Sequence, residues 1–373
     1  MKRIYFDNGS TSFPKAPGVG KAMADFIEKV GVNIGRGGYE EAYSAAEVVL
    51  DTREKLCRLF HFDKPENVIF TANSTEALNI AINGLFEKGD HVITTIYEHN
   101  SVLRPLYHLE KSGLITLSIA KSIGKDLESE VISLLNKNTK LVAITGASNV
   151  TGEVLPWRDL AHTLHAKNVL FMLDGAQLGG HLPINVVEDK LSFLCLAGHK
   201  ALGGIMGVGV LIIGENVDLN PTVFGGTGVD TFSKEQPLFL PEKLEAGTLN
   251  LPSIVALGEG VLFSAKGINR SQKRLTLATE NIINQLKKIP NVTTYSNPNP
   301  CGIVSFKHAG FDSVTLATIL SDEYDIAVRG GYHCAPLLHE YLKTNDQGLV
   351  RVSLSPFNTD NEINNFLTAV KLL

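Results

Sequence analysis

Two short apolar runs in the middle of the chain each lead to a residue that could do chemistry. Residues 169–173 end on Asp174, and residues 191–196 are followed closely by Lys200. If both runs are strands of one α/β sheet, their carboxyl ends meet at the edge where ligands bind. Pyridoxal 5'-phosphate (PLP) needs a lysine to form a Schiff base with its aldehyde and an acid to keep its pyridine nitrogen protonated. The pair therefore predicts a PLP site.

Each of these residues alone has a simpler structural explanation. Asp174 could cap a turn and Lys200 could be a solvated surface lysine, and for a single residue such explanations are the more common ones. Gln177 follows the acid by three residues, and His199 directly precedes the lysine. The combination favours the cofactor site over the structural explanation.

A strand–turn–helix pattern earlier in the chain could bind the phosphate of the cofactor. Residues 67–70 read as a strand and residues 76–86 as a helix, with Ser74 and Thr75 at the turn between them. Free N–H groups and the helix dipole make such a turn an anion site. The same residues could equally serve as an ordinary N-cap. Both roles can hold at once.

Two further polar residues follow predicted strands. His99 comes after residues 91–95, where an aromatic ring could stack on the pyridine, although a lone loop histidine is more often a surface residue. Asn149 comes after residues 139–145, where its amide could bind the cofactor or a substrate carboxylate. Asparagine is also a standard turn residue, so turn chemistry is the alternative for Asn149.

Cys334 is the cysteine with the most reactive predicted surroundings. It precedes a predicted helix over residues 335–342 and follows His333. A helix N-terminus and a nearby histidine both lower the pKa of a thiol and raise its thiolate fraction. The alternative is a small buried hydrophobic residue. The cysteines within helix or strand patterns are expected to be core residues: Cys57, Cys195 and Cys301.

Arg351 lies in the predicted strand over residues 349–354. A planar guanidinium group suits bidentate binding of an amino-acid carboxylate. Arg351 is therefore a candidate for the residue that binds the substrate.

The pattern of the whole chain predicts an α/β fold. Strands and helices alternate from residue 67 to residue 213, which predicts a mostly parallel sheet with helices on both faces. A long helical region then leads to a C-terminal part in which strands and helices also alternate. We expect a large domain of residues 15–255 and a smaller lobe of residues 1–14 and 256–373.

Composition excludes several classes of protein. The 373 residues are 44% hydrophobic and 20% charged, as in ordinary globular proteins, and the formal net charge of −5 gives no basis for nucleic-acid or anionic-membrane binding. The four cysteines lack CxxC spacing, so no metal site is expected. We expect no apolar segment long enough to cross a membrane and no signal peptide, which favours a cytoplasmic protein.

The segments 174–177 (DGAQ) and 198–200 (GHK) resemble the cysteine desulfurase branch of the class V aminotransferase family, whose members are fold-type I PLP enzymes. The match extends from YFDNGST near residue 5 to VRVSLSPFNT near residue 359. Residues 329–335 resemble the RxGxHCA motif of group II desulfurases. The resemblance implies a large PLP-binding domain and a smaller C-terminal α+β domain.

The resemblance also implies roles for individual residues. Ser74 and Thr75 would bind the phosphate, and His99 would stack on the ring and take part in proton transfer. Asn149 and Arg351 would bind the substrate. Further cofactor-binding residues would be Asp174, Gln177, His199, Lys200 and Thr248. Thr248 would reach the phosphate of the partner subunit, which implies a homodimer.

The implied reaction converts L-cysteine to L-alanine and leaves the sulfur on Cys334 as a persulfide, from which an acceptor protein or a reductant takes it. Three alternatives stay open. One is a selenocysteine lyase, and another is a different class V reaction, such as that of an aminotransferase, a C–S lyase or an epimerase. The third is a non-catalytic sulfur carrier or assembly partner.

Overall fold

A computed structural model describes residues 3–34 and 37–373 of the chain. Among these residues, the largest sheet has seven strands in the order β2-β8-β7-β6-β5-β3-β4. β8 runs antiparallel to β2 and β7, and the other neighbouring strands are parallel. The sheet is thus mostly parallel, as predicted. Its strands are β2 (Val68–Thr71), β3 (Asp90–Thr95), β4 (Ile115–Ala120), β5 (Thr139–Thr145), β6 (Leu170–Asp174), β7 (Phe193–Ala197) and β8 (Gly209–Ile213).

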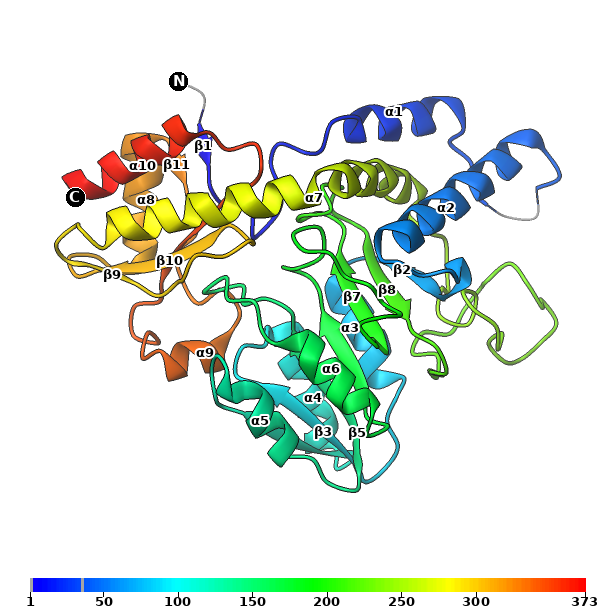
Figure 1. The fold of residues 1–373 in the computed structure, drawn as a ribbon. Helices are drawn as coiled ribbons and strands as arrows, with labels where there is room; N and C mark the ends of the chain where they lie inside the picture. Colours follow the sequence, from blue (N-terminus) through cyan, green and yellow to red (C-terminus); the bar gives the residue numbers. More distant parts are fainter. Residues whose placement is uncertain (1–2, 35–36) are drawn as a thin grey trace.

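Helices cover both faces of this sheet (Figure 1). The first face packs against α2 (Glu40–Leu59), α5 (Asp126–Ser133) and α6 (Trp157–His165). The second face packs against α3 (Ser74–Asn83) and α4 (Asn100–Lys111). Successive side chains of a strand point to opposite faces, so neighbouring residues enter different cores. On β6, for example, Phe171 and Leu173 belong to the first core, whereas Met172 belongs to the second.

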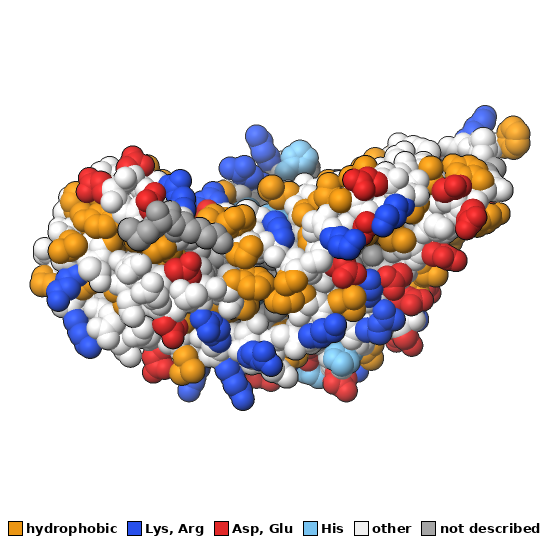
Figure 2. Space-filling model, turned by 90° about the horizontal axis from the view of Figure 1, so that it is seen from above, with side chains coloured by type: hydrophobic (Ala, Val, Ile, Leu, Met, Phe, Trp, Pro, Cys, Tyr) orange, Lys and Arg blue, Asp and Glu red, His pale blue; other side chains and the backbone are white. Residues whose placement is uncertain are grey.

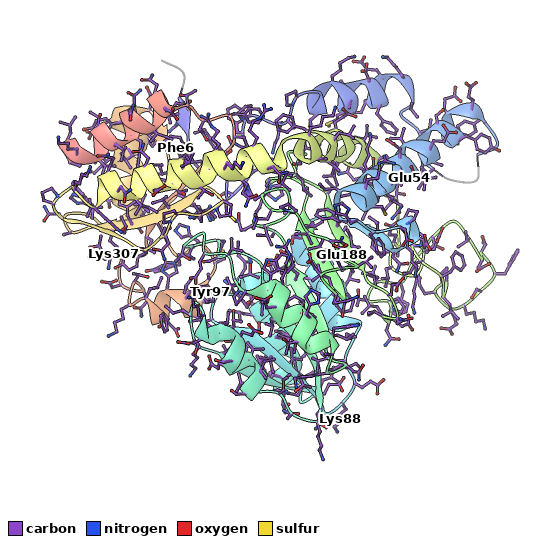
Figure 3. The ribbon with its side chains drawn as sticks, in the orientation of Figure 1. Phe6, Glu54, Lys88, Tyr97, Glu188 and Lys307 are labelled. Carbon is purple, nitrogen blue, oxygen red and sulfur yellow. The ribbon has the colours of Figure 1, made fainter. Side chains whose placement is uncertain are left out.

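A smaller group of strands forms the other lobe. β1 (Ile4–Tyr5) pairs with β11 (Ile326–Ala327), and β10 (Ile303–His308) pairs with β9 (Val292–Thr294) and β12 (Val350–Ser353). The helices here are α8 (Ser313–Tyr324) and α10 (Asp360–Leu372), whereas α9 (Pro336–Tyr341) contributes Leu338 to the first core of the large sheet. Phe6 lies in this lobe, whereas Lys88 lies at the opposite end of the molecule (Figure 3).

The long helix α7 (Leu251–Leu286) connects the lobes and runs beside α1 (Val19–Lys29). Its first half contributes Leu257 to the core of the large sheet, and its second half contributes Ile282 to the core of the small lobe. The predicted division at residue 255 falls inside this helix, so the domain boundaries stay a prediction.

The expectation that no segment is apolar and long enough to cross a membrane is wrong for α7. The helix contains an 18-residue window with a mean hydropathy of 1.3, which by length and composition alone could cross a membrane. Half of that window is buried inside the protein. The apolar residues therefore reflect packing between the two cores. Figure 2 shows basic and acidic side chains intermixed on the face seen from above, in line with 34 basic and 39 acidic residues in the chain.

Most predicted elements are present within a few residues of their expected limits, and β5 has the limits expected. Residues 100–133 carried no predicted element but form α4, β4 and α5. β4 is the edge strand of the sheet and most of its side chains are partly exposed, so its sequence lacks a clear buried run.

An aromatic cluster holds α10 in the small lobe. The ring of Phe366 is fully buried, 5.9 Å from the ring of Phe6 and 6.1 Å from the ring of Phe306. We expect Phe366→Ala to lower the free energy of unfolding by about 3–5 kcal/mol, because it removes buried surface and leaves a cavity. Urea denaturation would measure the change. Leu372→Ala, at a 70% exposed position of the same helix, is the control, and an equal effect of both variants would contradict the prediction.

Candidate active site

The strand ends at one edge of the sheet form a pocket. β6 and β7 lie side by side in parallel, with Asp174 opposite Cys195, and Lys200 follows three residues after β7. Asp174 and Lys200 therefore lie at the same edge of the sheet, as expected. The pocket is lined by Asn73, Ser74, Thr75, Leu78, His99, Ser101, Thr145, Asn149, Asp174, Ala176, Gln177, Ala197, His199 and Lys200. It thus brings together the predicted cofactor-binding residues except Thr248.

Burial shifts the pKa values of the acid and the amine in this pocket. Burial raises the pKa of Asp174, although the N–H of Ala176 donates to its Oδ1 at 2.9 Å and opposes the shift. Burial lowers the pKa of Lys200 to about 8, against the opposing effect of Asp174. A lysine with this pKa has an appreciable neutral fraction near neutral pH, which both a nucleophile and a general base require.

The start of α3 leaves a hydroxyl group available for a ligand. Asn73 caps the helix, since its side chain accepts from the N–H of Glu76 at 3.0 Å. The expected alternative, an N-cap by Ser74 or Thr75, is therefore wrong. The Oγ of Ser74 is buried and has no hydrogen-bond partner among the described residues. Thr75 Oγ1 lies 2.8 Å from Ser101 Oγ.

The hydrogen bonds of His99 determine its tautomer. His99 is the N-cap of α4, and its Nδ1 accepts from the N–H of Ser101 at 3.0 Å. Burial and the nearby Lys200 lower the pKa of His99 to about 4, so the ring is neutral at pH 7. A neutral ring that accepts at Nδ1 carries its proton on Nε2. His99 therefore offers a donor at Nε2.

The N-terminal segment contacts two residues that line the pocket. The side chain of Gln177 donates to the carbonyl of Gly9 at 2.9 Å, and the carbonyl of His199 accepts from the N–H of Ser12 at 2.9 Å. The Nδ1 of His199 is buried without a partner among the described residues. Burial lowers the pKa of His199 to about 4.

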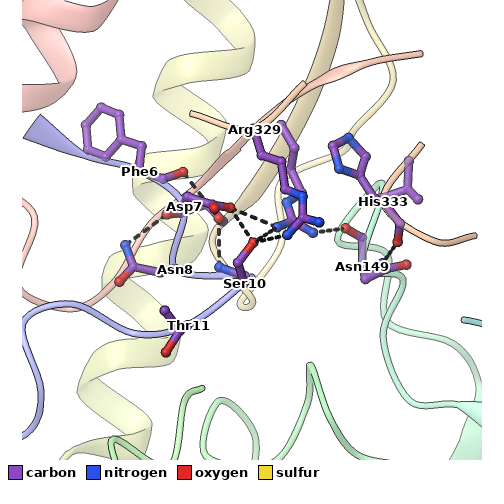
Figure 4. Close-up of polar contacts among 12 residues, drawn as sticks. Phe6, Asp7, Asn8, Ser10, Thr11, Asn149, Arg329 and His333 are labelled. Carbon is purple, nitrogen blue, oxygen red and sulfur yellow. Dashed lines mark hydrogen bonds and ion pairs between the residues drawn. The ribbon is translucent and has the colours of Figure 1, made fainter. Parts of the chain in front are cut away.

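Asn149 and Arg351 are linked to each other and to the loop that carries Cys334. The side chain of Asn149 donates to the carbonyl of His333, and its backbone carbonyl accepts from Nη1 of Arg351 at 3.0 Å (Figure 4). Arg351 is 2% exposed and its Nε–H has no partner among the described residues. A buried donor of this kind is costly unless an acceptor binds to it.

Cys334 lies outside this pocket, in a neighbouring groove. Its side chain is exposed, and the groove that it lines also contains His99 and Arg104. Its backbone has φ 58°, in the left-handed region, and its carbonyl accepts from the N–H of Asn100 at 2.8 Å. His99 contributes to both the groove and the pocket.

The sequence analysis expected His333 to lower the pKa of the Cys334 thiol, and this expectation is wrong. The ring of His333 is buried, with Nε2 3.1 Å from the carbonyl of Leu349, and burial lowers its pKa well below the usual value. His333 is therefore neutral at pH 7 and adds no positive charge beside Cys334.

The other cysteines are core residues, as predicted. Burial raises the pKa of Cys57 to about 11 and of Cys301 to about 12, and it also raises the pKa of Cys195. All four cysteines lie in the described part of the chain, and among them Cys334 is the exposed one.

Thr248 lies elsewhere on the surface. It is exposed and lines a separate groove with Arg53 and Glu245. The structure of the single chain thus keeps Thr248 apart from the pocket of Ser74 and Thr75.

The sequence interpretation also missed Glu98 and Asp7. Glu98 is fully buried, and its Oε1 accepts from Thr95 Oγ1 at 2.7 Å and from the N–H of Thr145 at 3.1 Å. Burial raises the pKa of Glu98 to about 8. Asp7 pairs with Arg351 at 3.0 Å. Glu98 could have been singled out by its place beside His99, and Asp7 by its place in the segment YFDNGST that matches the family.

The neutral histidines predict a loss of stability in acid. The pKa of His99 and His199 is about 4 in the folded protein but about 6.5 in an unfolded chain. The unfolded state therefore binds more protons between these pH values, so this stability is present above about pH 6.5 and is lost as the pH falls toward 4. Glu98, whose pKa is raised to about 8, acts in the opposite direction over this range, so the test is a comparison of variants. Without cofactor, the urea midpoint of His199→Gln should rise relative to that of wild type between about pH 7 and about pH 5, because the variant lacks one of the two histidines. His165→Gln, at an exposed position, should show no such relative change, and equal changes in both variants would contradict this.

Comparison with known proteins identifies relatives across the whole chain. The model of the aminotransferase class-V family matches residues 4–366. A probable cysteine desulfurase from Methanothermobacter thermautotrophicus is 31% identical over 369 residues, which cover 96% of this chain and 92% of that protein.

Solved structures agree with these relatives. The apo structure of a cysteine desulfurase from Thermococcus onnurineus is 30% identical, with a TM-score of 0.92 over 99% of this chain and 94% of that one. A cysteine desulfurase from Escherichia coli is 25% identical, with a TM-score of 0.89 over 99% and 94% of the two chains. These similarities confirm the predicted fold class, that of the fold-type I PLP enzymes. The chain belongs to the aminotransferase class-V family, in which its relatives include proteins named as cysteine desulfurases.

Proposed function

We propose that this protein is a PLP-dependent cysteine desulfurase, which converts L-cysteine to L-alanine and takes up the sulfur as a persulfide on Cys334. The observation that carries the proposal is the position of His99. This residue lines both the pocket that contains Lys200 and the groove that contains the exposed thiol of Cys334. The pocket of the lysine and the groove of the thiol are thus neighbours that share the side chain of His99.

Two buried polar atoms support PLP as the cofactor. Ser74 Oγ and His199 Nδ1 both lack partners among residues 3–34 and 37–373, so a bound polar group would satisfy them. Ser74 begins a ten-residue helix, where a phosphate is favoured. Asp174 would hold the pyridine nitrogen, and His99 would cover the ring. When bound, PLP stores the electron pair released at the substrate α-carbon.

The chain's own residues would then bind the substrate and move its protons. Arg351 would bind the α-carboxylate through donors that include its unpartnered Nε–H. Lys200 Nζ, with its pKa lowered to about 8, would accept the α-proton and return a proton to the carbon fragment. The neutral His99 would donate or hold a proton at Nε2.

Cys334 would receive the sulfur. Its thiolate would attack the substrate sulfur, forming a sulfur–sulfur bond while the bond from that sulfur to the β-carbon breaks. The electron pair of the broken bond stays with the carbon fragment, which takes up a proton and leaves as alanine. An exposed residue such as Cys334 could pass the sulfur on to an acceptor protein or a reductant. Free thiols persist in a reducing compartment, which supports a cytoplasmic location.

We expect Cys334→Ala to lower the rate of alanine formation from L-cysteine, in the presence of a reductant, by roughly 100-fold or more. The visible absorbance of bound PLP should remain, because Cys334 does not line the pocket that contains Lys200. Cys57→Ala is the matched control, since this thiol is buried in α2 and its raised pKa keeps it protonated.

Other outcomes would identify the alternative reactions. Full activity of Cys334→Ala, or no alanine from wild-type protein that contains PLP, would sink the proposal. Formation of a keto acid would indicate an aminotransferase, and alanine from selenocysteine alone would indicate a selenocysteine lyase. Protein that binds no PLP would point to a non-catalytic role.

We also propose a homodimer in which Thr248 of one subunit reaches the cofactor phosphate of the other. The proposal is supported by the exposure of Thr248 and its separation from Ser74 within one chain. Sedimentation should give the mass of a dimer, and Thr248→Ala should weaken PLP binding by roughly tenfold, because a hydrogen bond to a charged group is lost. Thr227→Ala in the same groove is the control. A monomer, or equal PLP affinity of the two variants, would refute the arrangement.

A further inference from the structure

Three chain segments that are far apart in the sequence bring charged side chains together beside the pocket. Asp7 follows β1, Arg329 follows β11, and Arg351 lies in β12. Arg329 and Arg351 are direct backbone partners, with hydrogen bonds of 3.1 and 2.7 Å between them. The backbone of Asp7 forms a parallel β-bridge with Ser353, which lies in β12 together with Arg351. Figure 4 shows Asp7, Ser10 and Arg329 converging there.

Only one assignment of donors and acceptors is consistent with the hydrogen bonds in this cluster. Ser10 Oγ lies 2.7 Å from Asp7 Oδ1, 3.0 Å from Arg351 Nη2 and 2.6 Å from Arg329 Nη1. A carboxylate only accepts and a guanidinium only donates, so the Ser10 hydroxyl donates to Asp7 and accepts from both arginines. Asp7 Oδ1 also accepts from Arg351 Nη2 at 3.0 Å. Asp7 thus neutralises part of the charge of two arginines.

The backbone around Asp7 is fixed, so its carboxylate stays beside Arg351. The Tyr5 hydroxyl donates to the carbonyls of Asp7 and Thr11 at 3.1 and 3.0 Å. Gly9 packs directly on Arg351, since a Cβ on Gly9 would lie 3.0 Å from its Cζ. The N–H of Gly9 donates to Ser353 Oγ at 2.8 Å. A ligand carboxylate on Arg351 would therefore have to bind close to the carboxylate of Asp7.

Two like charges on one guanidinium repel each other, and partial burial strengthens that repulsion. The side chain of Arg351 is 3% exposed and that of Asp7 is 22% exposed, so water screens the pair only in part. Asp7 therefore has two effects: it stabilises the buried arginine, and it weakens the binding of any carboxylate that arrives there.

We propose that Asp7 is a positioning residue that limits the affinity of the site for carboxylate ligands, so that the amino-acid product is released readily. The proposal rests on the proposed function, because it takes Arg351 as the residue that binds the α-carboxylate. Its consequence is specific: removing the negative charge of Asp7, while keeping an acceptor oxygen there, should make L-alanine bind more tightly.

The test compares the dissociation constants of L-alanine for wild-type holoenzyme and for Asp7→Asn, measured from the change in visible absorbance of bound PLP. We expect Asp7→Asn to bind L-alanine roughly tenfold more tightly, because a nearby like charge is removed. L-Alaninamide, which has no carboxylate, should bind no more tightly to the variant than to wild type. Asp25→Asn, an equal change of charge in α1 where Asp25 pairs with Lys21 and Lys29, should leave both constants unchanged.

Unchanged or weaker L-alanine binding in Asp7→Asn would overturn the proposal. Asp7→Ser provides a second neutral variant with an acceptor oxygen, and tighter binding in neither variant would also overturn it. Arg351→Gln separates this result from a failure of the proposed function. If Arg351→Gln binds L-alanine as well as wild type does, Arg351 is not the carboxylate-binding residue, and the role of Asp7 fails together with that assignment, whereas the desulfurase reaction is tested separately by Cys334→Ala. If Arg351→Gln loses L-alanine binding, but neither Asp7→Asn nor Asp7→Ser binds L-alanine more tightly than wild type, only the role of Asp7 fails.

Discussion

The parallel pairing of β6 with β7 is the constraint on which the site depends. It places Asp174 opposite Cys195, so that the acid and the segment leading to Lys200 reach the same edge of the sheet. Both strands are buried on their two faces, which fixes their register, because a shift by one residue would exchange the side chains between the two cores. The packing of Phe171, Met172 and Leu173 therefore positions the chemistry as well as stabilising the sheet.

Burial also sets the charge states at that edge. It raises the pKa of Asp174 and Glu98 and lowers that of Lys200, His99 and His199. Each shift favours the neutral form, which is the expected direction when charged groups leave water. A ligand with a positively charged ring nitrogen and a phosphate group would supply partners for several of these side chains at once.

How much the sequence could predict depended on whether the signal was local. Apolar runs that end in polar residues marked β5, β6 and β7, and with them Asn149, Asp174 and Lys200. The edge strand β4 lacked such a run because its side chains are only partly buried. The pair of Asp7 and Arg351 joins residues 344 positions apart, and neither position carries a pattern that indicates the other. The burial of His333 was likewise hidden, since its hydrogen-bond partner, the carbonyl of Leu349, lies 16 positions away and outside the local motif.

The helix α7 has a consequence for how the molecule folds. Leu257 and Ile282 belong to one rigid element but to different hydrophobic cores. Neither lobe can lose its structure without exposing apolar surface of a helix that the other lobe needs. The two lobes are therefore coupled into one cooperative unit, in which local opening of one is resisted by the other. The Ser264 hydroxyl of α7 donates to the carbonyl of Ala201, next to Lys200, at 2.8 Å, so the segment that carries Lys200 depends on the same helix.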